Sequence, residues 1–120
     1  MQIRIDVPGA LNNLGGDEEL LLGLATIFLE DVPVLMEQLQ SDYQAKNESE
    51  LVRHVHSLIG LLSNFAAEPA LELGKSLEWE LGNHRPLAQL GSQFSDFHLA
   101  MDATLLAIRN QVCADRACEY

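Results

Sequence analysis

A single histidine stands in an otherwise apolar stretch, and it is the residue with the clearest potential for chemistry. The segment reads HSLIGLLSNFAA, with Gly60 four residues, or about one helical turn, after His56. An imidazole is largely neutral near pH 7 and can act as a nucleophile, a proton carrier or a metal ligand. Glycine inside a helix costs about 1 kcal/mol relative to alanine, so its place beside His56 favours close approach by another molecule.

The helix that carries His56 is predicted to bury one face and leave the histidine outside it. At about 100° per residue, a stripe of apolar residues lies within about 40° of Leu51. His56 then lies about 140° and Gly60 about 180° from that direction, on the exposed wall of the helix. The predicted core stripe consists of Leu51, Val55, Leu58, Leu62 and Phe65.

The remaining histidines do not extend this site. His54 lies about 160° around the helix from His56, so the two imidazoles cannot bind one metal ion despite their H-x-H spacing. We expect His54 at a partly buried boundary, and His84 and His98 in loop or surface positions. The sequence therefore predicts no metal site, and we expect no cofactor.

Charge and composition exclude several classes of function. The chain of 120 residues carries 7 basic and 18 acidic residues, a formal net charge of -11, which disfavours binding to nucleic acids or anionic membranes. Its longest nearly unbroken apolar run, residues 20–29, is about half of the ~20 residues that cross a bilayer. We therefore expect a cytoplasmic protein that acts on other proteins.

The two cysteines and the absence of nucleotide-binding motifs limit the chemistry further. Cys113 and Cys118 lack the number and spacing of a zinc site or a disulfide framework, so we interpret both as free thiols. The sequence contains no G-x-x-x-x-G-K-[ST] loop, no G-x-G-x-x-G loop and no G-x-S-x-G turn. It therefore predicts neither a kinase nor a serine hydrolase.

The elements that must position His56 are helices. Apolar residues recur at three- and four-residue steps through long segments joined by short connections, which predicts an all-α protein. We expect a single domain over residues 1–120, folded as an antiparallel up-and-down four-helix bundle with a short extra N-terminal helix. The predicted segments are a short helix ending at Gly15, a long helix capped by Asp17, a helix over residues 48–66 capped by Asn47, a helix from about Glu68 to Gly82, and a helix from about Pro86 to Val112.

The segment around His56 also resembles a known family. HSLIGLLSNFAAEPALELGKSLE is similar to the signature of histidine-containing phosphotransfer (HPt) domains, His-[Ser/Thr]-Leu-Lys-Gly followed by small residues, Asn, an apolar residue, Gly-Ala and a helix ending in Leu-Glu. Upstream, IDVPGALNNLGGDEELLLGLATIFLEDVPVLMEQL looks like the first two helices of the family. The resemblance covers roughly residues 5–83, and the last helix agrees in pattern only.

The resemblance implies a module of a multistep phosphorelay in two-component signalling. It identifies His56 as the acceptor of a phosphoryl group from a receiver-domain aspartate, for transfer to the aspartate of another receiver. It also implies that Glu78 hydrogen-bonds and orients the ring of His56. The partners would be receiver domains of response regulators or of a hybrid sensor kinase, and the protein would be a monomeric phosphocarrier rather than a true enzyme. The implied docking surface around His56 comprises Arg53, Ser57, Ile59, Gly60, Ser63 and Lys75.

One departure from the family pattern leaves an alternative open. Ile59 stands where the family usually has lysine, so a cation that would steady the phosphoryl oxygens is missing. Arg53 or Lys75 could supply positive charge instead. The alternative is a degenerate HPt-like scaffold, which binds a receiver or a kinase without carrying phosphate.

Overall fold

Five α-helices build the protein in the computed structural model, which describes residues 3–113. They are α1 (Val7–Asn13), α2 (Glu18–Gln44), α3 (Glu48–Ser63), α4 (Glu68–Gly82) and α5 (Gly91–Ala107). A 3-10 turn, η1 (Leu87–Gln89), precedes α5, and a π-helical turn, η2 (Ile108–Val112), continues it. No strand occurs among the described residues. The predicted all-α bundle with a short extra N-terminal helix is confirmed.

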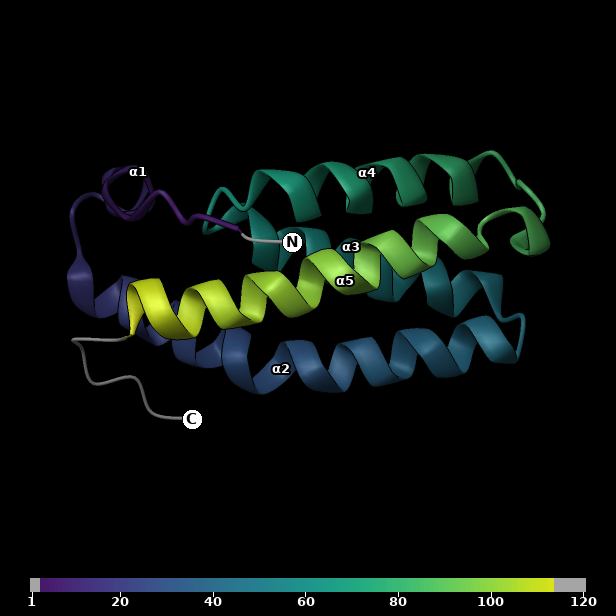
Figure 1. Cartoon of the computed structure of the whole chain (residues 1–120), viewed down its shortest axis with the longest axis horizontal. Coiled ribbons are helices and arrows are strands. Elements are labelled where there is room, and N and C mark those ends of the chain that lie inside the picture. Colours follow the sequence, from purple (N-terminus) through teal and green to yellow (C-terminus); the bar gives the residue numbers. More distant parts are fainter. Residues whose placement is uncertain (1–2, 114–120) are drawn as a thin grey trace.

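The four long helices run alternately up and down around one core. Figure 1 shows α4 above α2, with α5 in front of α3 and α1 at one end of the bundle. α3 contacts α2 and α4, and α5 contacts α4, η2 and, more sparsely, α2. The helices α3 and α5 therefore occupy opposite corners of the bundle, and their outer faces point in opposite directions.

Local capping explains where two of these helices begin. The side chain of Asp17 accepts a hydrogen bond from the backbone N–H of Leu20 at the start of α2. Asn47 likewise accepts from the N–H of Glu50 at the start of α3. Each cap satisfies one of the first N–H groups of a helix, which have no partner inside the helix. Both predicted caps are confirmed.

Four helix boundaries differ from the prediction. α1 ends at Asn13 rather than at Gly15, and α5 ends at Ala107, although the π-helical turn η2 continues to the predicted end at Val112. α3 ends at Ser63 rather than at residue 66, because Ala66 has a φ of 48°, in the left-handed region, which no α-helix contains. The last helix begins at Gly91 rather than near Pro86, which is extended, with φ of -56° and ψ of 132°. The intervening residues form η1 instead.

The apolar stripe predicted from the sequence packs α3 against the core. Leu51, Val55, Leu58, Leu62 and Phe65 are each fully buried. The ring of Phe65 meets that of Phe28 from α2 edge-on, with centroids 5.4 Å apart. Such aromatic pairs add about 0.5–1.5 kcal/mol to the burial of their area. This packing fixes the rotation of α3 and leaves the opposite wall of the helix to solvent.

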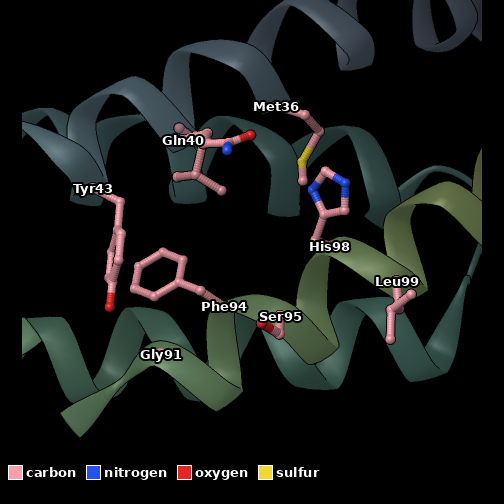
Figure 2. Close-up of a pocket in the computed structure, with 9 residues that line it drawn as sticks. Met36, Gln40, Tyr43, Gly91, Phe94, Ser95, His98 and Leu99 are labelled. Carbon is pink, nitrogen blue, oxygen red and sulfur yellow. The ribbon is translucent and has the colours of Figure 1, made fainter. Parts of the chain in front are cut away.

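The seam between α2 and α5 is the open side of the bundle. It holds a groove of about 480 Å³, shown in Figure 2, where the rings of Tyr43 and Phe94 lie side by side with centroids 4.7 Å apart. The thioether of Met36 points toward the imidazole of His98 across the groove (Figure 2). The lining residues are Met36, Leu39, Gln40 and Tyr43 from α2, and Gly91, Phe94, Ser95, His98 and Leu99 from α5. None of them belongs to α3.

The segment before α1 is tied to η2. The side-chain carbonyl of Gln111 accepts from the N–H of Ile5 over 2.6 Å, and its amide donates to the carbonyl of Ile3 over 2.8 Å. Both isoleucines are buried. No helix in the described part of the chain has the length and apolar character to cross a membrane.

Candidate functional site

His56 stands on the outer wall of α3. Its side chain is 76 % exposed, whereas its neighbour Val55 is fully buried. This contrast follows from the helical period, because the buried stripe of α3 turns His56 away from the core. The imidazole is therefore open to a partner as large as a folded domain.

Glu78 from α4 faces the ring of His56. Its Oε2 lies 2.7 Å from Nδ1 of the imidazole. Leu77 and Leu81 are buried in the core and set the rotation of α4, which leaves Glu78 at the edge toward α3. Because an ionised carboxylate only accepts hydrogen bonds, this contact favours the tautomer that has its proton on Nδ1 and its lone pair on Nε2.

At Gly60, one turn after His56, α3 carries no side chain. A Cβ added there would meet no atom of a neighbouring part of the molecule within 4 Å, so packing does not require glycine. Ser57 and Ser63 are also exposed on this wall. Their hydroxyls donate to backbone carbonyls one turn earlier, over 3.1 and 2.8 Å. These positions of the α3 wall therefore carry only small, uncharged side chains.

Ile59 is not part of that surface. It is only 9 % exposed, and its Cγ1 would lie 3.1 Å from a Cβ at Gly74 in α4. Its side chain fills the contact between α3 and α4, where a missing side chain at residue 74 makes room for it. The expectation that Ile59 lines an exposed docking surface is wrong, because the residue is on the side of α3 that α4 covers.

Arg53 is held by a neighbour on its own helix. Its Nη2 lies 2.5 Å and its Nε 3.1 Å from Oε2 of Glu50. The hydrogen bond with Arg53 lowers the pKa of the Glu50 carboxyl, and the same bond raises the pKa of the Arg53 guanidinium. The charge of Arg53 is therefore directed toward the start of α3, away from Gly60.

Lys75 provides a cation on the other side of the site. It is exposed on α4, one turn before Glu78. Residues three apart on a helix lie on the same side of it, so Lys75 and Glu78 share the edge that faces α3. Of the two cations expected near His56, Lys75 is the one that stands on the same edge of α4 as Glu78.

His54 has a structural environment. It is 5 % exposed, and its Nδ1 lies 2.5 Å from Oδ2 of Asp42 in α2. Its Nε2 lies 3.3 Å from Nη2 of Arg53. The imidazole therefore links α3 to α2, on the far side of the helix from His56. His54 is more deeply buried than the partly buried boundary position expected from the sequence, because it packs and pairs against α2.

A comparison with models of protein families identifies the family to which the chain belongs. The Hpt domain profile matches residues 23–111, which include both His56 and Glu78. The chain belongs to the Hpt domain family. Hpt domains act in histidine phosphotransfer within phosphorelays and interact with receiver domains, so this is the general role of the protein. Searches of curated proteins and of solved structures gave no significant match.

The Hpt bundle brings most of the expected site residues together. His56, Gly60 and Ser63 share the exposed wall of α3, and Glu78 and Lys75 face it from the edge of α4. Ser57 lies next to His56 on the same wall, whereas Arg53 is turned toward Glu50.

Trp79, which directly follows Glu78, was not predicted from the sequence to belong to the site. Trp79 is 66 % exposed, which is the highest exposed fraction among the large apolar residues that the structure describes. A helical wheel of α4 would have found it: with Gly74 and Leu77 inside, Trp79 falls on the outer side. An exposed aromatic residue thus directly follows the residue whose carboxylate contacts His56.

The cysteines differ from the expectation. Cys113 is buried and takes part in a disulfide bond, so its interpretation as a free thiol is wrong. Spacing rules for disulfide frameworks describe sets of four or more cysteines and do not test a single bond. Cys118 lies outside the described residues. Within residues 3–113, no group of three or more His, Cys, Asp or Glu side chains is arranged to hold a metal ion.

Proposed function

We propose that His56 accepts a phosphoryl group from a receiver-domain aspartate and passes it to the aspartate of another receiver. The observation that carries this proposal is the exposed imidazole with Nδ1 held by Glu78 at 2.7 Å. This contact fixes the tautomer in which Nε2 is the nucleophile. It also holds the ring in one orientation while a partner docks.

The proposed transfer is a substitution at phosphorus. The lone pair of Nε2 attacks the phosphorus of the aspartyl phosphate, and a P–N bond forms as the P–O bond to the aspartate breaks. The receiver carboxylate leaves with that electron pair, while the Nδ1 proton stays on the ring. In the second half, a carboxylate of the next receiver attacks the phosphorus and the P–N electrons return to Nε2.

Glu78 acts as a positioning residue in both halves. When Nε2 bonds to phosphorus while Nδ1 keeps its proton, the ring carries positive charge. A carboxylate 2.7 Å away favours that charge and accepts a charge-assisted hydrogen bond. With 36 % of the Glu78 side chain exposed, solvent screens part of this effect.

The surface for docking is proposed from the residues that the structure leaves open. Gly60 gives clearance for the receiver, and Ser57 and Ser63 flank it on α3. Lys75 offers the cation for the phosphoryl oxygens, in place of the lysine that the family usually has at residue 59. Arg53 remains at the margin of this surface, paired with Glu50.

The partners are proposed to be receiver domains of response regulators or of a hybrid sensor kinase. We expect one monomer of this protein to meet one receiver at a time in the cytoplasm. A scaffold that binds a receiver without carrying phosphate has the same docking surface, so only labelling of His56 separates the two functions.

The test is phosphorylation by a panel of receiver domains that carry aspartyl phosphate. We expect acid-labile, alkali-stable phosphate on the protein, lost in His56→Gln. The control is His98→Gln, because His98 is also exposed but lies on α5, at the opposite corner of the bundle. Receiver binding without label on His56 would favour the scaffold, and label retained in His56→Gln would contradict the assignment of the acceptor.

A further inference from the structure

Trp79 is an exposed aromatic residue that lies outside the hydrophobic core. The residue is 66 % exposed, on the outer side of α4, while Leu77 and Leu81 on either side of it are buried. It is also the only tryptophan of the chain. Burying a large aromatic side chain is among the strongest contributions that one residue makes to association, and exposing it gives no benefit to the monomer.

The location of Trp79 links it to the phosphotransfer site. It directly follows Glu78, whose carboxylate contacts His56, so its Cα is about 3.8 Å from that of Glu78. It also lies one turn after Lys75 on the same helix. A standard protein interface covers about 800 Å² on each partner, a disc with a radius of roughly 16 Å. A receiver centred on His56 therefore reaches Trp79.

The charge of the chain favours an apolar contact with the receiver. The chain has a formal net charge of -11, and the reactive residue of a receiver is itself a carboxylate. The net charge gives no long-range attraction toward that carboxylate, whereas a desolvated aromatic contact stabilises a complex whatever the net charge. The wall of α3 beside His56 offers no large exposed apolar residue, since Gly60, Ser57 and Ser63 occupy it.

We propose that Trp79 is a docking anchor, which a receiver domain buries when its active site closes over His56. This proposal rests on the function proposed above and adds a specificity-determining residue to it. The indole supplies apolar area, and its Nε1–H can donate to an acceptor of the receiver. The backbone under Trp79 is fixed, because its carbonyl accepts from the N–H and the side-chain amide of Asn83, over 3.1 and 2.8 Å.

The first experiment titrates the protein with unphosphorylated receiver domains that lack tryptophan and follows the fluorescence of Trp79. Because this residue is the only tryptophan, the emission reports its environment alone. We expect a shift to shorter wavelength on binding, and no shift with a tryptophan-free protein that is not a receiver. An unchanged spectrum at saturating receiver would overturn the proposal.

The second experiment compares the kinetics of transfer in Trp79→Ala, Trp79→Phe and the control Leu99→Ala. Leu99 is similarly exposed, at 58 %, but lies on α5, at the corner opposite α3. We expect Trp79→Ala to raise the KM for the receiver about tenfold or more with kcat nearly unchanged, Trp79→Phe to recover part of the loss, and Leu99→Ala to behave as wild type.

The outcomes separate this proposal from the proposed function. If the wild-type protein is labelled and Trp79→Ala has the KM of Leu99→Ala, the anchor is wrong and the phosphotransfer function stands. If no receiver labels the wild-type protein, the proposed function fails, and the fluorescence titration alone decides the anchor. A shift in emission then supports docking through Trp79, and its absence overturns it.

Discussion

Ile59 and Gly74 set how closely α3 and α4 approach each other. A Cβ at residue 74 would lie 3.1 Å from Cγ1 of Ile59 and 3.1 Å from Cε1 of Phe97, so the absence of a side chain at Gly74 is what lets these two buried residues pack. The same approach brings Glu78 to 2.7 Å from His56, about one turn further along α4. The geometry of the site thus depends on the packing beneath it.

Gly74→Ala is the direct test of this dependence. Overpacking a core typically costs about 1–3 kcal/mol, against about 1 kcal/mol gained when alanine replaces glycine in a helix. We therefore expect a net fall in the free energy of unfolding, measured with urea. Gly23→Ala is the control, since its Cβ meets nothing within 4 Å, and it should be more stable than wild type. A Gly74→Ala protein as stable as Gly23→Ala would show that the two helices have room to spare.

Gly60→Gln separates the need for clearance from the needs of the fold. The position is open, so glutamine should stabilise α3 by about 0.5–1 kcal/mol while its side chain stands beside His56. We expect transfer from a receiver to be blocked and the free energy of unfolding to rise. Gly23→Gln on α2 should give the same gain in stability with normal transfer. Normal transfer by Gly60→Gln would refute the clearance argument.

How much the sequence could predict depended on whether the signal was local. Asp17 and Asn47 were identifiable as caps because their side chains accept from N–H groups only three residues away. The end of α3 was not, because Ala66 adopts a left-handed conformation that alanine does not indicate. The bundle itself followed from the spacing of apolar residues, which reports burial directly.

The candidate site shows the same limit. The exposure of His56 could be predicted from the buried stripe of its own helix. The burial of Ile59 could not, because it depends on the glycine at residue 74 in another helix. Its position about 80° from the core stripe was compatible with either outcome. The pairing of His54 with Asp42 likewise depends on how α2 and α3 align.

His54→Gln should reduce stability without changing transfer. His54 is buried, and its loss leaves the carboxylate of Asp42 without the imidazole that lies 2.5 Å from it. An unsatisfied, largely buried polar group costs about 1–3 kcal/mol, which we expect to appear in urea unfolding. At temperatures where the variant is folded, its rate of labelling should match wild type. A double-mutant cycle with Asp42→Asn should show coupling, and additive effects would indicate that the contact contributes nothing.

Ile59→Lys restores the residue that the family usually has and tests the burial of this position. We expect the free energy of unfolding to fall by about 1–3 kcal/mol, because a buried isoleucine is replaced by a chain whose ammonium must reach solvent. The lysine ammonium should reach solvent near His56 and raise the transfer rate a few-fold at low salt. Ile27→Lys makes the same change of charge at a residue that is 43 % exposed and should leave stability nearly unchanged. Equal stabilities of the two variants would contradict the burial of Ile59.

Lys75→Gln tests which cation meets the phosphoryl group. Lys75 shares the α4 edge with Glu78, whereas Arg53 is bound to Glu50, so the ammonium of Lys75 is the one free to approach the oxygens at Nε2 of His56. An exposed pair of this kind changes a rate by up to about fivefold, and salt screens it. We expect Lys75→Gln to slow transfer by that factor at low ionic strength and by less as salt is added. Lys46→Gln removes the same charge at the end of α2, away from His56, and should leave the rate unchanged. If Lys46→Gln and Lys75→Gln slow transfer equally, the effect belongs to the net charge of the protein rather than to a cation at the site.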